Sequence, residues 1–215
     1  MNEQEIYQVV SGIVKNVLCG DAQSGANDIV PVEVSARHVH LTDSDVEALF
    51  GAGHKLTPKR ELSQPGQFLA EERVTLVTAK GEFHNVAVLG PTRKHTQVEL
   101  SLTDARSLGL NAPVRLSGDV KGCPAICILA GDKMLRAEEC VMVAQNHIHM
   151  SPADAARYGV HDGQEVRVKL ETSRPVTLDR VLIRVTETSA LAMHVDFDEA
   201  NACALPKDGK GKILK

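Results

Sequence analysis

From Ile29 onward the sequence is a series of short apolar runs separated by glycine and proline, and this pattern restricts the fold more than any other feature. Typical runs are "IVPVEV", "RVTLVTA" and "AICILAG". Runs of about four to eight residues rich in Val and Ile, bounded by turn residues, are typical of strands. Only brief helices fit between them, so alternating βαβ units are disfavoured. We therefore predict a mainly β chain with short helices (α+β), built as a barrel or a sandwich.

Three short helices are predicted from a shared design, a Ser or Thr cap at the start and a glycine after the end. Thr42 precedes "DSDVEALF" and Gly51, Thr103 precedes "DARSL" and Gly109, and Ser151 with Pro152 begins "ADAARY" before Gly159. The first and third helices belong to matching segments, "RHVHLTDSDVEALFG" and "NHIHMSPADAARYG". The separation in sequence from His38 to His147 equals that from His40 to His149. This constant offset indicates an internal duplication whose halves could face each other across a site.

The first twenty residues read as a separate amphipathic helix. Apolar residues recur with helical spacing at Ile6, Val9, Val10, Ile13, Val14, Val17 and Leu18. Gly20 ends the pattern, and "DAQSGAND" reads as a polar linker. Such a helix either docks on its own domain or serves as a detachable peptide that binds a partner, and the linker favours the second interpretation.

Composition excludes several classes of partner. Aromatic residues make up 3% of the chain, Trp is absent and the net charge is -4, which disfavours stacking on nucleic acid. No apolar run reaches the ~18 residues of a membrane span, and the N-terminus does not have the pattern of a secretory signal. Five cysteines, Cys19, Cys123, Cys127, Cys140 and Cys203, show no CxxC spacing, which suits reduced thiols. We expect an intracellular protein with no nucleic-acid or membrane partner.

Two His-x-His pairs are the strongest chemical signal. Residues i and i+2 of a strand point to the same face, so His38 with His40, and His147 with His149, each form a bidentate pair suited to Zn²⁺ or a similar metal. Glu99 and His194 are candidates for further ligands. Glu99 stands directly before the second capped helix, in the slot that the histidine pairs occupy elsewhere, and His194 lies alone in the apolar run "LAMHVDFD".

The competing interpretation of each histidine is an ordinary surface or core residue. It is preferred for His54, His84 and His161, which lie in loop-like or polar contexts, and with some reservation for His95.

A basic turn precedes Glu99. In "LGPTRKHTQVE" a Gly-Pro turn is followed by Arg93, Lys94 and His95. The planar fork of arginine matches phosphate oxygens, so the turn reads either as an anion-binding loop or as a solvated basic turn. Its position beside Glu99 links it to the metal.

Familiar templates are missing. The chain has no GxxxxGK[ST], GxGxxG or GxSxG motif. An amidohydrolase barrel would need about 250 residues. A cupin would need a Glu shortly after His40, where none occurs.

From about Val30 to its end the chain resembles the PduL-type phosphate propanoyltransferases, the phosphotransacylases of bacterial microcompartments. The resemblance rests on "SARHVHLT", "LGPTRKHTQVELS", "NHIHMSP" and "AMHVDFDEAN", in that order. It implies two β-barrel domains side by side, with two zinc ions at their junction. It also implies that one metal is bound by His38, His40 and His194, and the other by Glu99, His147 and His149. Arg93 matches the essential active-site arginine of that family.

The resemblance further implies a domain plan. Residues 28–36 and 145–215 would form one barrel and residues 37–144 the other, with a lid at about 80–109. Residues 1–27 resemble an encapsulation peptide that binds microcompartment shell or cargo proteins and directs the enzyme to the compartment lumen. A homodimer is expected by the same analogy.

The expected reaction joins an acyl-CoA, propanoyl-CoA being favoured, with inorganic phosphate to give acyl phosphate and CoA, reversibly. Two zinc ions would be cofactors and CoA a substrate. No cysteine adjoins a histidine motif, so direct displacement is preferred to an acyl-enzyme. Two alternatives stay open: a metal-dependent acyl-CoA thioesterase or hydrolase that uses water, and a non-catalytic metal-binding scaffold protein. Propanoyl and acetyl differ by one methylene, worth only ~1–3 kcal/mol, so the acyl chain is also open.

Overall fold

A computed structural model describes residues 28–214. The expected N-terminal helix and linker, and Cys19, lie outside these residues. No helix within the described range is long and apolar enough to cross a membrane. Cys123, Cys127, Cys140 and Cys203 are all free thiols, as expected.

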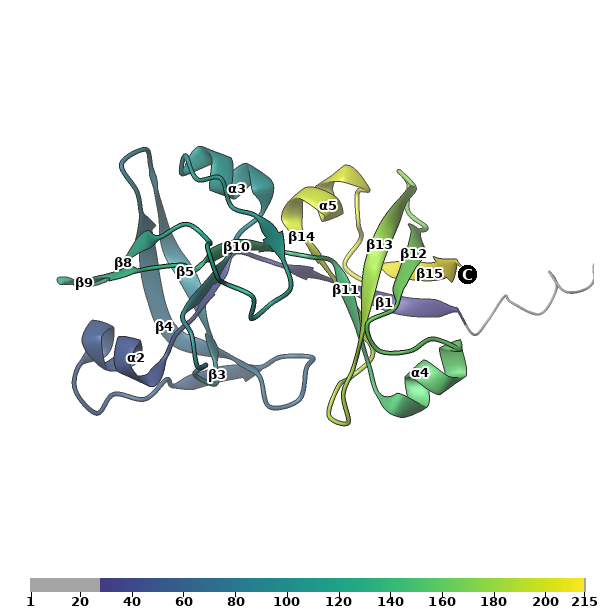
Figure 1. Ribbon diagram of the computed structural model, residues 1–215, viewed down its shortest axis with the longest axis horizontal. Helices are drawn as coiled ribbons and strands as arrows, with labels where there is room; N and C mark the ends of the chain where they lie inside the picture. The colour runs from purple at the N-terminus through teal and green to yellow at the C-terminus, as the bar shows by residue number, and fades with distance from the viewer. Residues whose placement is uncertain (1–27, 215) are drawn as a thin grey trace, which may run out of the picture.

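The described chain forms two β lobes that lie side by side along the long axis of the molecule (Figure 1). The barrel lobe is a closed barrel in the order β1 (Ile29–Ser35), β14 (Ala192–Asp196), β11 (His147–Met150), β13 (Val176–Val185), β12 (Glu165–Leu170) and β15 (Lys210–Leu214). The sheet lobe is a nine-stranded sheet in the order β7 (Val114–Arg115), β10 (Val141–Ala144), β6 (Gln97–Glu99), β2 (His38–His40), β5 (Glu82–Gly90), β4 (Phe68–Val77), β8 (Ile126–Ala130) and β9 (Lys133–Ala137), with β3 (Pro58–Glu61) paired to β4. The predicted fold class is confirmed, although the sheet lobe is curled rather than closed.

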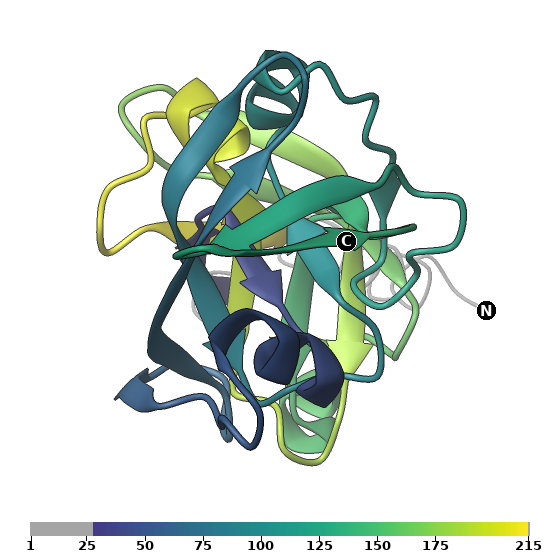
Figure 2. The ribbon, with the colours of Figure 1, turned by 90° about the vertical axis from the view of Figure 1, so that its left-hand side faces the viewer.

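The chain passes from one lobe to the other after β1 and again after β10, in opposite directions. β1 pairs with β14 and β15 in the barrel lobe, and the chain then enters β2 of the sheet lobe. β10 pairs with β6 in the sheet lobe, and the chain then enters β11 of the barrel lobe. Figure 1 shows β1 and β10 running lengthwise through the middle of the molecule, and in the end-on view of Figure 2 the two lobes lie one behind the other. Each lobe is therefore completed by a strand that leads into the other.

Strand register confirms the internal duplication. β2 lies antiparallel to β6 with His38 opposite Glu99, and β11 lies antiparallel to β14 with His147 opposite His194. The same offset in sequence relates β1 to β10, because Met142 of β10 follows Glu33 of β1 by the same number of residues by which His147 follows His38. Met142 pairs with Glu99 and Glu33 pairs with His194, both in parallel register. Glu99 therefore corresponds to His194, and the prediction that it occupies the slot of a histidine pair is wrong.

Four short helices follow the four central strands: α2 (Asp43–Phe50), α3 (Leu102–Ser107), α4 (Pro152–Tyr158) and α5 (Phe197–Ala202). Their N-caps are Thr42, Ser101, Ser151 and Asp196, and each cap side chain accepts the backbone N–H three residues further on. The predicted cap Thr103 is wrong, because Ser101 Oγ accepts from Asp104 N and starts the helix earlier. The helix α5 was not predicted, since "LAMHVDFD" has the apolar content of one continuous strand.

Each lobe has its own apolar core. Val39 is fully buried in the core of the sheet lobe, and Ile148 is fully buried in the core of the barrel lobe. Each of these residues lies between the two histidines of a His-x-His pair, and alternate side chains of a strand point to opposite faces. Burial of Val39 and Ile148 therefore turns both histidine pairs away from the cores.

We predict that Ser101→Ala lowers the free energy of unfolding by about 1 kcal/mol, because the first turn of α3 loses its cap. Thr103→Ala is the matched control. Thr103 is exposed and its hydroxyl caps nothing, so its loss should change stability by less than about 0.5 kcal/mol. Urea unfolding of both variants measures the difference, and an equal or larger effect at Thr103 would contradict the cap assignment.

Candidate metal centre at the lobe junction

Six potential ligands reach the junction by one repeated local design. His40, Glu99, His149 and His194 each stand two residues before an N-cap, so each lies at the end of a strand that runs directly into a helix. The structure brings the six side chains together in two groups, within each of which the ligand atoms lie within 4.8 Å of one another. The Glu99 cluster consists of His38, His40 and Glu99. The His194 cluster consists of His147, His149 and His194.

The division of ligands implied by the resemblance is wrong. It paired His194 with His38 and His40, and it paired Glu99 with His147 and His149. Strand pairing explains the observed division, because β2 adjoins β6 in the sheet lobe and β11 adjoins β14 in the barrel lobe. Each histidine pair therefore shares its cluster with the ligand from the neighbouring strand of its own lobe.

Backbone carbonyls fix the tautomers of three histidines. Nδ1 of His38 lies 2.8 Å from the carbonyl oxygen of Ala36, Nδ1 of His147 lies 2.7 Å from that of Gln145, and Nδ1 of His40 lies 3.3 Å from that of Leu89. A carbonyl oxygen can only accept, so Nδ1 carries the proton and Nε2 presents a lone pair to the cluster. A hydrogen bond from the second ring nitrogen is the usual support of a metal-binding histidine. The donors therefore fit a metal ion.

The Glu99 cluster is buried and holds a carboxylate between two imidazoles. Glu99 oxygens lie 3.6 Å from His38 Nε2 and 4.0 Å from His40 Nε2. Burial acts to raise the pKa of Glu99, but His38, His40 and Arg93 outweigh it and hold that pKa well below its usual range. Burial acts to lower the pKa of His38, and the charge of Glu99 more than offsets it, so the pKa is raised. Burial, with His38 and Arg93 nearby, lowers the pKa of His40 well below its ordinary value.

The His194 cluster consists of imidazoles alone. Nε2 of His147 lies 3.1 Å from Nε2 of His149, and the ring of His194 lies 5.3 Å and 4.9 Å from theirs between centroids. Burial lowers the pKa of His147 to about 4 and that of His149 to about 3, with His194 and Arg184 contributing. Both rings are therefore neutral near pH 7, which is the form that binds a metal.

Arg93 is tied to the Glu99 cluster through a serine. Its Nη1 donates to Ser117 Oγ at 3.1 Å, and Ser117 Oγ donates to Glu99 Oε1 at 3.1 Å. The backbone N–H of Arg93 donates to the carbonyl oxygen of Leu41 at 2.9 Å, which fixes the turn against the end of β2. The buried side chain of Gln97 also donates to Glu99. The link between Arg93 and Glu99 predicted from their proximity in sequence is thus present.

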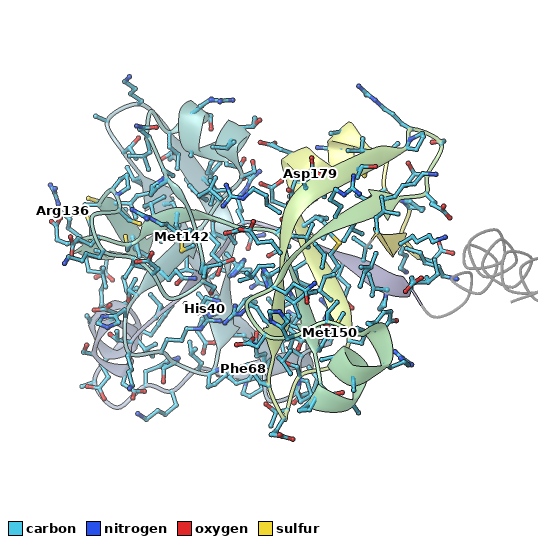
Figure 3. All side chains as sticks on the ribbon, turned by 45° about the vertical axis from the view of Figure 1, so that its right-hand side comes forward. His40, Phe68, Arg136, Met142, Met150 and Asp179 are labelled. Atoms are coloured by element: carbon cyan, nitrogen blue, oxygen red, sulfur yellow. The ribbon has the colours of Figure 1, made fainter. Side chains whose placement is uncertain are left out.

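One pocket of about 690 Å³ joins these groups, and both lobes line it. It includes all six potential ligands and five arginines, Arg37, Arg60, Arg73, Arg93 and Arg184. Figure 3 shows the labelled His40 toward the junction of the lobes, whereas Arg136 lies at the outer end of the sheet lobe. The volume is in the range of about 300–1,000 Å³ typical of small-molecule sites.

Sequence reasoning missed Ser117 and Arg184, which line the pocket, and Gln97, which donates a hydrogen bond to Glu99. Ser117 lies in a stretch with no motif. Arg184 lies in β13 opposite His149, a position that only strand register reveals. Gln97 had a usable signal, because it stands two residues before Glu99 and so shares its face.

The other four histidines lie outside both clusters. His84, His95 and His161 are exposed, as expected. His54 is half-buried instead, because its Nε2 pairs with Glu72 at 2.8 Å.

The junction pocket lies between two facing β lobes and combines two clusters of potential metal ligands with a set of arginines. These features make the chain a candidate metal-dependent enzyme that acts on an anionic substrate. Comparison with known proteins narrows this class. A family described as phosphate propanoyltransferase matches residues 31–206. The chain belongs to the phosphate propanoyltransferase family, a family of transferase enzymes.

Relatives with that name are similar over most of their length. The phosphate propanoyltransferase of Leptotrichia buccalis is 47% identical over 215 residues, which is 100% of both chains. That of Thermotoga maritima is 54% identical over 175 residues, covering 81% of this chain and 83% of the relative. That of Enterococcus faecalis is 45% identical over 208 residues, covering 97% of this chain and 96% of the relative.

The metal-free protein is predicted to lose stability as the pH falls from about 6.5 toward 4. The pKa of His147 is about 4 in the folded chain and near 6.5 in the unfolded chain, so the unfolded chain takes up the proton first and becomes favoured. Between about pH 7.5 and pH 5 this histidine alone should lower the free energy of unfolding by roughly 2 kcal/mol. Urea unfolding with a chelator present measures this loss.

The variant His147→Gln should lack this part of the loss, whereas His161→Gln, at an exposed position, should keep it. An unchanged pH dependence in His147→Gln would contradict the assignment.

Proposed function

We propose that this chain transfers an acyl group between CoA and inorganic phosphate, with propanoyl as the favoured acyl group and with a zinc ion in each cluster. One observation carries the proposal: both ligand clusters and Arg93 line the same pocket between the lobes. The names of the relatives support the same reaction. Zinc held by His38, His40 and Glu99 and by His147, His149 and His194 would supply Lewis-acid chemistry, which would polarise a thioester carbonyl and suit a soft thiolate leaving group.

Arg93 and Arg184 are the residues suited to hold phosphate. Arg93 comes from the sheet lobe and Arg184 from the barrel lobe, and both line the pocket. Burial lowers the pKa of Arg93, and the nearby charge of Arg184 lowers it further. A phosphate dianion between two guanidinium groups would relieve this repulsion and accept paired hydrogen bonds from a planar fork. Ser117 fixes the direction of the Arg93 side chain through its hydrogen bond.

The proposed reaction is a direct displacement, with no covalent intermediate on the enzyme. A phosphate oxygen forms a bond to the thioester carbonyl carbon while the carbon–sulfur bond breaks. The sulfur leaves with the electron pair and takes up the proton that the phosphate gives up, so the products are acyl phosphate and CoA. The reverse direction uses the same groups. Among the described residues no cysteine lines the pocket, and burial raises the pKa of Cys123, Cys140 and Cys203, which argues against a cysteine acyl-enzyme.

Two alternative functions use the same clusters. A thioesterase would transfer the acyl group to water, and it would need no site for inorganic phosphate beside the clusters. A metal-binding scaffold protein would need no pocket of substrate size. Both alternatives are weaker than the transferase on these grounds.

Release of CoA from propanoyl-CoA is predicted to require inorganic phosphate and bound metal. A thiol reagent measures release across acetyl-, propanoyl- and butanoyl-CoA, with and without phosphate, before and after treatment with a chelator and restoration of zinc. Equal rates with and without phosphate would identify a thioesterase. Absence of release under every condition would favour the scaffold.

Arg93→Lys is predicted to lower kcat at least about 100-fold, because an ammonium group cannot replace the paired donors of the guanidinium fork. Arg106→Lys, on the exposed face of α3, is the matched control and should keep the parent rate. Steady-state kinetics with phosphate as the varied substrate separates KM from kcat. Parent kinetics in Arg93→Lys would remove Arg93 from the active site.

We also propose that residues 28–36 and 145–215 form one domain and residues 37–144 the other, with a lid at about 80–109. We further propose that the chain forms a homodimer. Residues 1–27 lie outside the described residues, and we propose that they deliver the enzyme into a bacterial microcompartment lumen by binding shell or cargo proteins. The low aromatic content and the net charge of -4 support the absence of a nucleic-acid partner.

Deletion of residues 1–27 should leave the rate of the purified enzyme unchanged and abolish its co-purification with microcompartments. Retention of the shortened chain in the compartments would contradict this role.

A further inference from the structure

The buried side-chain amide of Gln97 contacts three groups around the Glu99 cluster. Its Nε2 donates to Glu99 Oε1 and, at 2.9 Å, to Ser117 Oγ. Its Oε1 accepts the backbone N–H of Gly118 at 2.7 Å. A backbone N–H can only donate, so the amide oxygen faces Gly118 and the side-chain N–H groups face Glu99 and Ser117. The orientation of the amide is therefore fixed, and Gln97 is only 1% exposed.

These hydrogen bonds determine how Ser117 and Glu99 are presented to the site. The Ser117 hydroxyl accepts from Gln97 Nε2 and from Arg93 Nη1. Its own proton is therefore directed to Glu99 Oε1, at 3.1 Å. Gln97 and Ser117 together supply two donors to Glu99 Oε1, which occupy both lone pairs of that oxygen. Glu99 Oε2, which lies 3.6 Å from His38 Nε2, is left as the oxygen that can bind a metal.

The barrel lobe shows that strand pairing does not need this amide. Gln97 lies opposite His40, and the residue in the same slot of the barrel lobe is Ala192, opposite His149. Ala192 is equally buried and its side chain is a methyl group. The pairing of β14 with β11 therefore forms without a side-chain hydrogen bond at this position. A glutamine in the sheet lobe serves the carboxylate of Glu99, which the other cluster lacks, rather than the fold.

We propose that Gln97 is a positioning residue that acts through Glu99 and Ser117. It holds Glu99 with one oxygen toward the metal of its cluster. It also directs the Ser117 hydroxyl, which in turn orients Arg93 for phosphate. This inference rests on the proposed phosphate transfer and on zinc in the Glu99 cluster. Hydrogen bonds to a ligating side chain typically contribute about 10–100-fold to metal affinity or activity.

The zinc affinity of each cluster, measured without substrate, separates positioning from a structural role. His147→Ala/His149→Ala leaves only the Glu99 cluster complete, and His38→Ala/His40→Ala leaves only the His194 cluster complete. Gln97→Met keeps the length of the side chain and removes the amide. In competition with a chelator it should weaken Zn²⁺ binding about 10-fold in the first background and should not change it in the second. An equal effect in both backgrounds, or none in the first, would overturn the proposal.

Gln164→Met is the matched control. The Gln164 side chain accepts the backbone N–H of His161 in the turn before β12, outside the junction pocket. This change should leave both zinc affinities at the parent values. Gln97→Met in the otherwise native chain guards against misfolding of the two backgrounds, since one of its two zinc ions should dissociate more easily than in the parent. Equal weakening of both ions would indicate general destabilisation and would overturn the proposal.

Kinetics with phosphate as the varied substrate test the coupling of Gln97 to Ser117. Gln97→Met and Ser117→Ala should each lower kcat/KM about 10-fold. The double variant should lose well under the roughly 100-fold of two independent effects, because both changes release the same oxygen of Glu99. A full 100-fold loss would contradict the shared network. Failure of phosphate-dependent CoA release in the native protein would refute the proposed function, whereas the zinc affinities would still test the role of Gln97 at the metal.

Discussion

The arrangement of the site depends on the alternation of side chains along two short strands. Val39 and Ile148 are fully buried in separate cores, and each has a histidine on either side. Because neighbouring side chains point to opposite faces, burial of the apolar residue forces both histidines toward the junction. A shift of one residue in either strand would turn the histidines into the apolar cores and move the apolar residue to the junction, so hydrophobic burial fixes the geometry of the potential ligands.

Reciprocal exchange of β1 and β10 couples folding of the lobes to assembly of the site. Each lobe needs a strand that leads into the other lobe, so neither half of the duplication can complete its sheet alone. The same exchange carries Glu33 to the barrel lobe and Met142 to the sheet lobe. Duplication thus supplies two similar clusters, and the difference between Glu99 and His194 at corresponding positions makes them chemically different.

The sequence predicted the parts of this structure that depend on local signals. The strand-rich fold, the caps Thr42 and Ser151, and the facing histidine pairs all follow from residue spacing. The division of ligands between the clusters could not be predicted, because it depends on which strands become neighbours, and the paired strands are far apart in the sequence. The cap at Ser101 was missed because Ser101 and Thr103 are both plausible caps, and only the hydrogen bond to Asp104 distinguishes them.

The central claim is that the junction holds two separate metal ions, one in each cluster. Anomalous diffraction from crystals of the zinc-loaded protein, recorded on both sides of the zinc absorption edge, tests it most directly. Two peaks per chain are predicted, one about 2.0–2.2 Å from the ligand atoms of His38, His40 and Glu99, and one at the same distance from those of His147, His149 and His194. A single ion shared between the lobes, or no peak at either cluster, would contradict the account.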